Sequence, residues 1–189
     1  MRRSDPLLEY TITFLEMTSP PGAPPPPPSG AGGLALIRAK EPPRRWFLHL
    51  YQSVGAGHEW TDWLRADPAE LDAFLQNPSV ALYSLILDGW SGGFFVLDWR
   101  VEGVCDLAYF GLAPEAQGRG LARWLLAEAL RAGWEGRGMR RMTVQTNTLD
   151  HPRALPLYQR GGFTPYAQET RRRAARQANE TGETHLPKA

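Results

Sequence analysis

The sequence of 189 residues is poor in cysteine, since Cys105 is its only one. A single thiol excludes an internal disulfide framework and a zinc site built on cysteines. No run approaches the roughly 18 consecutive apolar residues of a membrane-spanning helix. The opening stretch, MRRSDPLLEY, has a basic pair but lacks the apolar region of a signal peptide. We therefore expect a cytoplasmic protein without a membrane partner.

The chain also lacks an excess of charge of either sign. Lys and Arg total 21, Asp and Glu total 20, and the formal net charge is +1. This balance argues against a general nucleic-acid or membrane-surface binder. Hydrophobic residues make up 42% of the sequence, so a chain of this length fits one domain with a sizeable core.

Hydrophobic periodicity and turn signals divide the chain into strands and helices. Runs typical of strands lie at Leu7–Met17, Leu34–Ala39, Val80–Leu87, Phe94–Arg100, residues 104–112, Met142–Asn147 and Phe163–Gln168. Amphipathic spacing and boundary residues predict helices at Arg44–Val54, about Pro68–Gln76, Arg119–Ala132 and within residues 151–162. Antiparallel strands followed by a strand–helix–strand–helix–strand order predict a mixed α/β sheet with helices on its faces.

Two segments stand apart from this pattern. Ser19–Gly30 is rich in proline, which favours an extended polyproline II connector, although a ligand for a proline-reading partner is the alternative. Residues 169–189 have no apolar period and are expected to be frayed or disordered. The predicted organisation is a strand and connector over residues 1–33, one domain over 34–168, and a tail.

The stretch EAQGRGLARWLL, residues 115–126, places two glycines and an arginine at the start of a predicted helix. The first turn of a helix leaves backbone N–H groups unpaired and carries partial positive charge, which suits a phosphate. Gly118 and Gly120 would let a ligand approach the backbone closely, and Arg119 adds a cation. Neither a P-loop nor a dinucleotide fingerprint is present. An ordinary strand-to-helix turn is the alternative.

Two motifs in order resemble the GNAT N-acetyltransferase superfamily. Gln117 to Ala122 fits the Q/R-x-x-G-x-G/A signature, and ALPLYQRGGFTPY resembles the second motif, A-x-x-L-Y-x-x-x-G-F. The resemblance covers about Leu34–Tyr166. It implies a mixed, mostly antiparallel sheet of six to seven strands flanked by about four helices. In that fold, two parallel strands splay apart to form the acetyl-CoA cleft.

The resemblance implies acetyl-CoA as the acetyl donor and no metal. The diphosphate would lie on the amides of Gln117, Gly118, Arg119, Gly120, Leu121 and Ala122. The pantetheine arm would pair with Phe110, Gly111 and Leu112 like an added strand. His151 stands where the family commonly has an asparagine that touches this arm; alternatively, it helps to cap the helix opened by Pro152.

The resemblance also implies two catalytic residues. Asp106 lies eleven residues before Gln117, at the offset of a catalytic glutamate in one branch of the family, and would take a proton from the acceptor amine. Tyr158 would donate a proton to the departing thiolate. The alternatives are a solvated carboxylate and a core tyrosine, with Glu59 and Glu102 as other carboxylates. An acyl-cysteine route through Cys105 is the alternative to direct transfer in a ternary complex.

The acceptor is expected beside the segment GAGHEWTDWLR, residues 55–65. Trp60 and Trp63 would line its pocket with Glu59 as a polar contact, unless both indoles pack into the core. The acceptor would be a small-molecule amine or a protein amine, and the protein a monomer or homodimer. A non-catalytic acyl-CoA-binding module is the alternative function. A scaffold that works through the proline-rich segment is a further alternative; under the acetyltransferase interpretation, deletion of Ser19–Gly30 should leave cofactor affinity nearly intact.

Overall fold

The computed structural model describes residues 7–30 and 32–174. In this part of the chain, seven strands form one sheet in the order β2-β3-β4-β5-β6-β1-β7. The strands are β1 Leu7–Met17, β2 Leu34–Ala39, β3 Val80–Leu87, β4 Trp90–Asp98, β5 Val104–Leu112, β6 Arg141–Asn147 and β7 Thr164–Ala174. The helices are α1 Arg44–Gly55, α2 Asp62–Arg65, α3 Pro68–Leu75, α4 Leu121–Trp134 and α5 Ala154–Arg160, with single 3₁₀ turns at Ala56–His58 and Pro114–Ala116. The predicted mixed, mostly antiparallel fold is confirmed.

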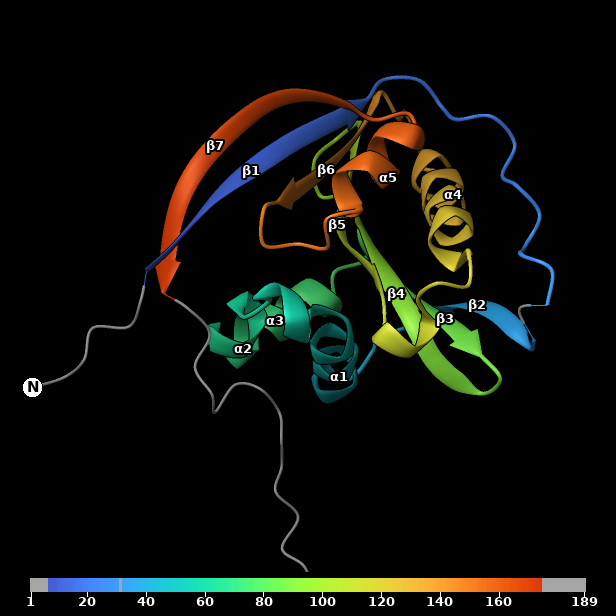
Figure 1. Cartoon of the computed structure of the whole chain (residues 1–189), viewed down its shortest axis with the longest axis horizontal. Coiled ribbons are helices and arrows are strands. Elements are labelled where there is room, and N and C mark those ends of the chain that lie inside the picture. Colours follow the sequence, from blue (N-terminus) through green and yellow to red (C-terminus); the bar gives the residue numbers. More distant parts are fainter. Residues whose placement is uncertain (1–6, 31, 175–189) are drawn as a thin grey trace, which may run out of the picture.

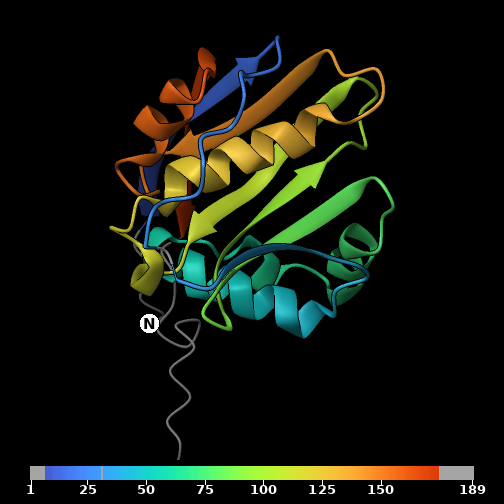
Figure 2. The same ribbon diagram turned by 90° about the vertical axis from the view of Figure 1, so that its right-hand side faces the viewer.

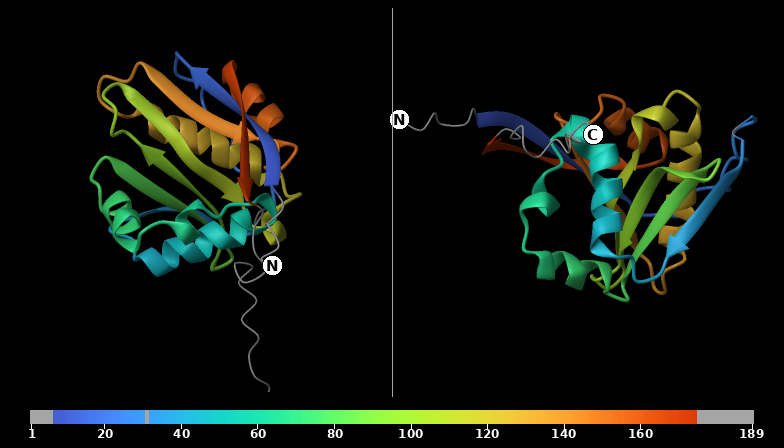
Figure 3. Two further views of the ribbon diagram at one scale, coloured as in Figure 1. Left: turned by 90° about the vertical axis from the view of Figure 1, so that its left-hand side faces the viewer. Right: turned by 90° about the horizontal axis from the view of Figure 1, so that it is seen from below.

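The helices cover both faces of the sheet (Figures 1 and 3). Helices α4 and α5 lie on one face, where Leu121, Leu125 and Met142 belong to the larger core cluster. Helices α1 to α3 lie on the other face over a second cluster that includes Phe47 and Phe94. No helix in residues 7–30 and 32–174 is long and apolar enough to cross a membrane.

Two boundaries differ from the predictions for physical reasons, and one proline is accommodated inside a helix. Helix α4 begins at Leu121 instead of Arg119, because Gly118 and Gly120 adopt φ of 75° and 74°, which no α-helix contains. Strand β4 begins directly after the two-residue turn Asp88-Gly89, so residues 90–93 extend the strand. Pro156 lies in the first turn of α5, where a missing N–H removes no helical hydrogen bond.

Strand β1 lies inside the sheet. It pairs antiparallel with β6 on one side and with β7 on the other, and Figure 1 shows it curving beside β7. Strand β7 continues to Ala174, so residues 169–174 are part of the sheet and the expectation of a frayed tail from residue 169 is wrong for them. Residues 175–189 of that expected tail lie outside the described residues.

The proline-rich segment connects β1 to β2, which are on opposite sides of the sheet centre. Figure 2 shows it crossing the outer face of α4. At one end, Pro20 and Pro21 lie beside Trp134; at the other end, Pro28 lies beside Trp124. The segment is therefore a connector that packs along a helix.

Candidate functional site

The two parallel strands of the sheet separate soon after they meet. Strands β5 and β6 pair only where Val104–Asp106 faces Arg141–Thr143. Beyond that point β5 pairs with β4 alone, while β6 pairs with β1. One edge of the outer half of β5 is thus left without a partner strand, and its backbone groups are available to a ligand that can pair with a strand.

A cavity of about 400 Å³ opens at this separation. Residues from three parts of the chain contribute to its lining: the end of β5, residues 117–122, and α5. We call residues 117–122 the glycine segment. The lining includes every predicted cofactor residue except Arg119: Phe110, Gly111, Leu112, Gln117, Gly118, Gly120, Leu121, Ala122 and His151. Arg123, Arg153 and Arg160 add three cations to the same cavity, which suits a polyanionic ligand.

The glycine segment is built to expose backbone amides. Gly120 precedes the first turn of α4, and no side chain caps that turn. A Cβ placed on Gly118 would meet nothing within 4 Å, and one on Gly120 would meet only Pro28, at 3.9 Å. The glycines are required by their positive φ instead of by crowding. The space before the unpaired N–H groups is open, as a phosphate site needs.

Tyr158 lies on α5 at the inner wall of the cavity. Its ring makes edge contacts with Phe110 and Phe163, at 6.0 and 6.1 Å between centroids. Only 6% of the residue is exposed. Burial, aided by the charges of Asp150 and Asp106, raises the pKa of Tyr158 above its usual value. The hydroxyl therefore keeps its proton at neutral pH and is available as a donor.

Asp106 lies at the foot of the separation and does not line the cavity. Its Oδ1 accepts a hydrogen bond of 2.5 Å from the hydroxyl of Thr143. Burial raises the pKa of Asp106, the hydrogen bond from Thr143 lowers it, and the charge of its cross-strand neighbour Asp98 raises it. The net result is a carboxyl whose pKa lies above its ordinary value, a property of carboxylates that act as bases.

Cys105 belongs to the core. Its side chain is fully buried in the cluster under α4, and burial raises the pKa of its thiol. A thiol in this state is a poor nucleophile, which favours direct transfer over an acyl-cysteine route. Within the described residues, no group of three or more His, Cys, Asp and Glu side chains is placed to hold a metal ion.

The aromatic residues predicted for the acceptor pocket separate into two environments. Trp60 lines the cavity, and its Nε1 donates a hydrogen bond of 3.1 Å to Oδ1 of Asp150. Trp63 stacks on Phe74 at 5.3 Å in the core below α1 and α3. Glu59 ends the 3₁₀ turn with a φ of 57° and does not line the cavity.

Asp150 is a site residue that the sequence reasoning missed. Its Oδ2 accepts hydrogen bonds from the hydroxyl of Thr146 and from the backbone N–H of Asn147, at 2.8 and 2.9 Å. With Trp60 on Oδ1, one carboxylate joins the start of α5 to the α1–α2 loop. The polar run TNTLD between a strand and a helix was the available signal, since aspartate often organises such turns.

His151 both lines the cavity and shapes the start of α5. Its Nδ1 accepts a hydrogen bond of 3.1 Å from the backbone N–H of Arg153. Its ring contacts that of His58 edge-on at 5.8 Å, so two imidazoles lie side by side at the rim. The predicted contact with a cofactor arm and the alternative of a capping role are compatible in this geometry.

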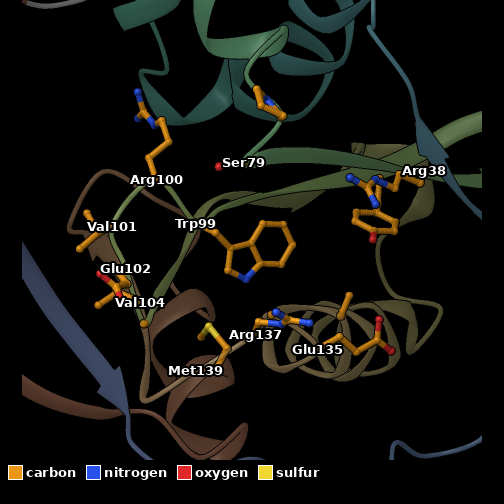
Figure 4. Close-up of a pocket in the computed structure, with 15 residues that line it drawn as sticks. Arg38, Ser79, Trp99, Arg100, Val101, Glu102, Val104, Glu135, Arg137 and Met139 are labelled. Atoms are coloured by element: carbon orange, nitrogen blue, oxygen red, sulfur yellow. The ribbon is translucent and has the colours of Figure 1, made fainter.

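A second cavity, of about 650 Å³, lies at the other end of α4 (Figure 4). Trp99 occupies its centre, with Arg38, Arg137 and Glu135 around it. Nε1 of Trp99 donates a hydrogen bond to the carbonyl of Gly133. Glu102, an alternative carboxylate in the sequence reasoning, lies here. This second cavity shares no lining residue with the cavity at the glycine segment.

Comparison with known proteins finds one matching family model and solved structures with the same fold. The family model for the acetyltransferase (GNAT) domain matches residues 82–165. A GCN5-related N-acetyltransferase from Sphaerobacter thermophilus superposes with a TM-score of 0.60 at 20% identity, over 89% of this chain and 52% of that chain. A second one, from Kribbella flavida, superposes with a TM-score of 0.56 at 17% identity, over 89% of this chain and 59% of that chain.

A smaller relative aligns over nearly its whole length. AAC(6')-Iy, solved in complex with the bisubstrate analog CoA-S-monomethyl-acetylneamine, has a TM-score of 0.51 at 22% identity, over 70% of this chain and 92% of that chain. The present chain spans about half to three fifths of the first two structures. A search of curated proteins found no match.

Proposed function

We propose that this protein transfers the acetyl group of acetyl-CoA to a primary amine by direct attack with both substrates bound, because residues 82–165 match the family model of the acetyltransferase (GNAT) domain and the chain has the corresponding fold. One observation carries the proposal. The cavity at the separation of β5 and β6 brings together the unpaired strand end, the glycine segment and Tyr158.

The cavity fits the parts of acetyl-CoA in order. Phe110, Gly111 and Leu112 would pair with the amide groups of the pantetheine arm, since no strand lies along their edge. The amides from Gln117 to Ala122 would hold the diphosphate, and the cavity arginines supply positive charge. When bound, acetyl-CoA would supply an acetyl group already activated as a thioester.

Two side chains would manage the protons. Tyr158 would donate its proton to the departing sulfur, because burial keeps the phenol protonated and places it on the cavity wall. Asp106 would receive the proton that the acceptor ammonium must lose before attack. Since Asp106 lies beyond the cavity lining, that proton would reach it through a bridging water. The same carboxylate then returns its proton to solvent, while the second proton that the nitrogen loses as the amide forms would restore the phenol of Tyr158.

The acceptor proposed for the first test is a small-molecule amine. Compared structures include an aminoglycoside acetyltransferase from a soil metagenome in complex with sisomicin, with a TM-score of 0.54 at 17% identity over 68% of this chain and 86% of that chain. Trp60 and the two rim histidines would form the apolar and polar walls beside the thioester.

The deciding experiment measures thiol release from acetyl-CoA over a panel of aminoglycosides, polyamines, amino acids and peptides with a free N-terminus. We expect at least one amine to accelerate release and to yield an acetylated product by mass spectrometry. Tyr158→Phe serves as the matched inactive control. Cofactor binding without turnover of any amine would instead identify a non-catalytic acyl-CoA-binding module.

A further inference from the structure

The proline-rich segment follows the outer face of α4 from its end to its beginning (Figure 2). Pro20 and Pro21 lie beside Trp134 near the last turn of α4. Pro27 and Pro28 lie beside Trp124 near the first turn. The segment therefore ends its passage at the mouth of the proposed diphosphate site, and we call Pro27–Pro28 the proline wall.

The proline wall touches the glycine segment itself. Pro28 is the residue that a Cβ on Gly120 would meet, at 3.9 Å, and Gly120 is open on its other sides. Pro28 is half-buried and Pro27 is exposed. A ligand held on the amides at the start of α4 thus has rigid pyrrolidine surface along one side, and a proline wall costs little conformational entropy to hold in place.

Behind the proline wall lies a cavity of about 510 Å³ between the segment, β2 and α4. Both prolines, Leu34, Leu36 and Trp124 contribute apolar surface to its lining. Glu128 supplies a carboxylate, which also pairs with Arg131. Trp124 is about 6 Å along the helix axis from Gly120, slightly more than one helical turn, so the cavity begins close to the diphosphate position.

We propose that this cavity is the subsite for the adenosine end of acetyl-CoA, with the proline wall and Trp124 packing against the purine. This rests on the proposed function, because it takes the diphosphate to lie on the glycine segment. A planar base with apolar faces suits the two prolines and the indole, and the purine amino group can donate to Glu128. The proline-rich segment is then part of the cofactor site as well as a connector.

If the proline wall holds the adenosine, deletion of Ser19–Gly30 should weaken cofactor binding, contrary to the prediction from the sequence. A mere connector would leave cofactor affinity nearly intact when altered, whereas a wall of the nucleotide subsite would not. The distinction rests on one end of the segment, since only Pro27 and Pro28 lie near Gly120. Pro20 and Pro21 pack on the same helix at its far end and provide a matched control.

The test compares two donors by isothermal titration calorimetry, acetyl-CoA and S-acetyl-4′-phosphopantetheine, which lacks the adenosine with its 3′-phosphate and one phosphate of the diphosphate. One variant is Pro27→Ala with Pro28→Ala. The other is Leu36→Trp, which enlarges a side chain that lines the cavity from β2 and leaves the segment unchanged. We expect each to weaken acetyl-CoA binding about fivefold or more, roughly 1 kcal/mol, and to leave the truncated donor unaffected. Pro20→Ala with Pro21→Ala should bind both donors like the wild type.

The outcomes separate this inference from the proposed function. If the wild type binds acetyl-CoA and both wall variants bind it equally well, the adenosine lies elsewhere and the inference is wrong. A wild type that binds the two donors with equal affinity has the same consequence. A wild type that binds neither donor overturns the proposed function together with the inference. Thermal melting of each variant verifies that it is folded.

Discussion

The hydroxyl of Thr143 donates a hydrogen bond of 2.5 Å to Oδ1 of Asp106 across the last paired position of β5 and β6. The two strands separate immediately beyond this pair. This hydrogen bond stabilises the charged form of Asp106. The pKa of the proposed base therefore depends on how β5 and β6 lie where they separate. Asp98, opposite Asp106 on β4, acts in the other direction.

Thr143→Val should raise the pKa of Asp106, since the bond that favours the charged form is lost. A base must be deprotonated to act, so activity falls as pH drops through its pKa. We expect the acid limb of the kcat/KM profile to move up by about one pH unit. Asp98→Asn should move it down, because a like charge is removed. If neither variant shifts the limb, Asp106 is not the titrating group.

Tyr158→Phe should lower kcat by a factor of about 100 or more, since a general acid contributes at least that much. The phenylalanine ring keeps the contacts with Phe110 and Phe163. We therefore expect the Kd for acetyl-CoA to stay within about twofold of the wild-type value, roughly 0.4 kcal/mol. Steady-state kinetics and calorimetry measure the two quantities. A variant with normal turnover would rule out the acid role.

Gly120→Glu should abolish binding of acetyl-CoA, because it places bulk and negative charge before the amides of α4. Gly120 has a φ of 74°, so any other residue is strained there by about 1–2 kcal/mol. Gly120→Ala is the matched control, since it carries that strain without the charge. Binding by Gly120→Glu as strong as that of Gly120→Ala would place the diphosphate elsewhere.

Asp150→Ala should destabilise the protein by about 2–4 kcal/mol, because three donors lose their acceptor. These are Nε1 of Trp60, the Thr146 hydroxyl and the Asn147 N–H. Asp67→Ala removes a single helix-capping bond to Ala69 and should cost only about 1 kcal/mol. Urea unfolding of both variants gives the comparison. Equal losses would mean that Asp150 does not join the α1–α2 loop to α5.

Local sequence patterns predicted the structure correctly where a segment determines its own conformation. The Asp88-Gly89 pair turns the chain directly between β3 and β4, as such a pair does in hairpins. The residues predicted to hold the cofactor, apart from Arg119, share a cavity because one motif follows β5 and the other follows β6, the two parallel strands. Trp60 and Trp63 illustrate the limit, since they are only three positions apart and packing from distant elements decides which of them reaches the cavity.

Local sequence patterns could not predict which strands lie next to each other in the sheet. The pattern at Leu7–Met17 predicts a β-strand, but the same alternation would suit any neighbouring strand. The approach of Pro28 to Gly120 follows from the route that the connector takes over α4, which polyproline composition does not specify. Both features depend on contacts between residues more than ninety positions apart.

The insertion of β1 between β6 and β7 has a consequence for biosynthesis. Strand β1 is synthesised before the other strands of this sheet, yet both of its neighbours are synthesised after β5. Until then, both of its hydrogen-bonding edges stay open, and such edges invite association with other chains. The sheet therefore cannot close around β1 until residues 141–174 have been synthesised, and a stall before that point would leave this strand without either partner.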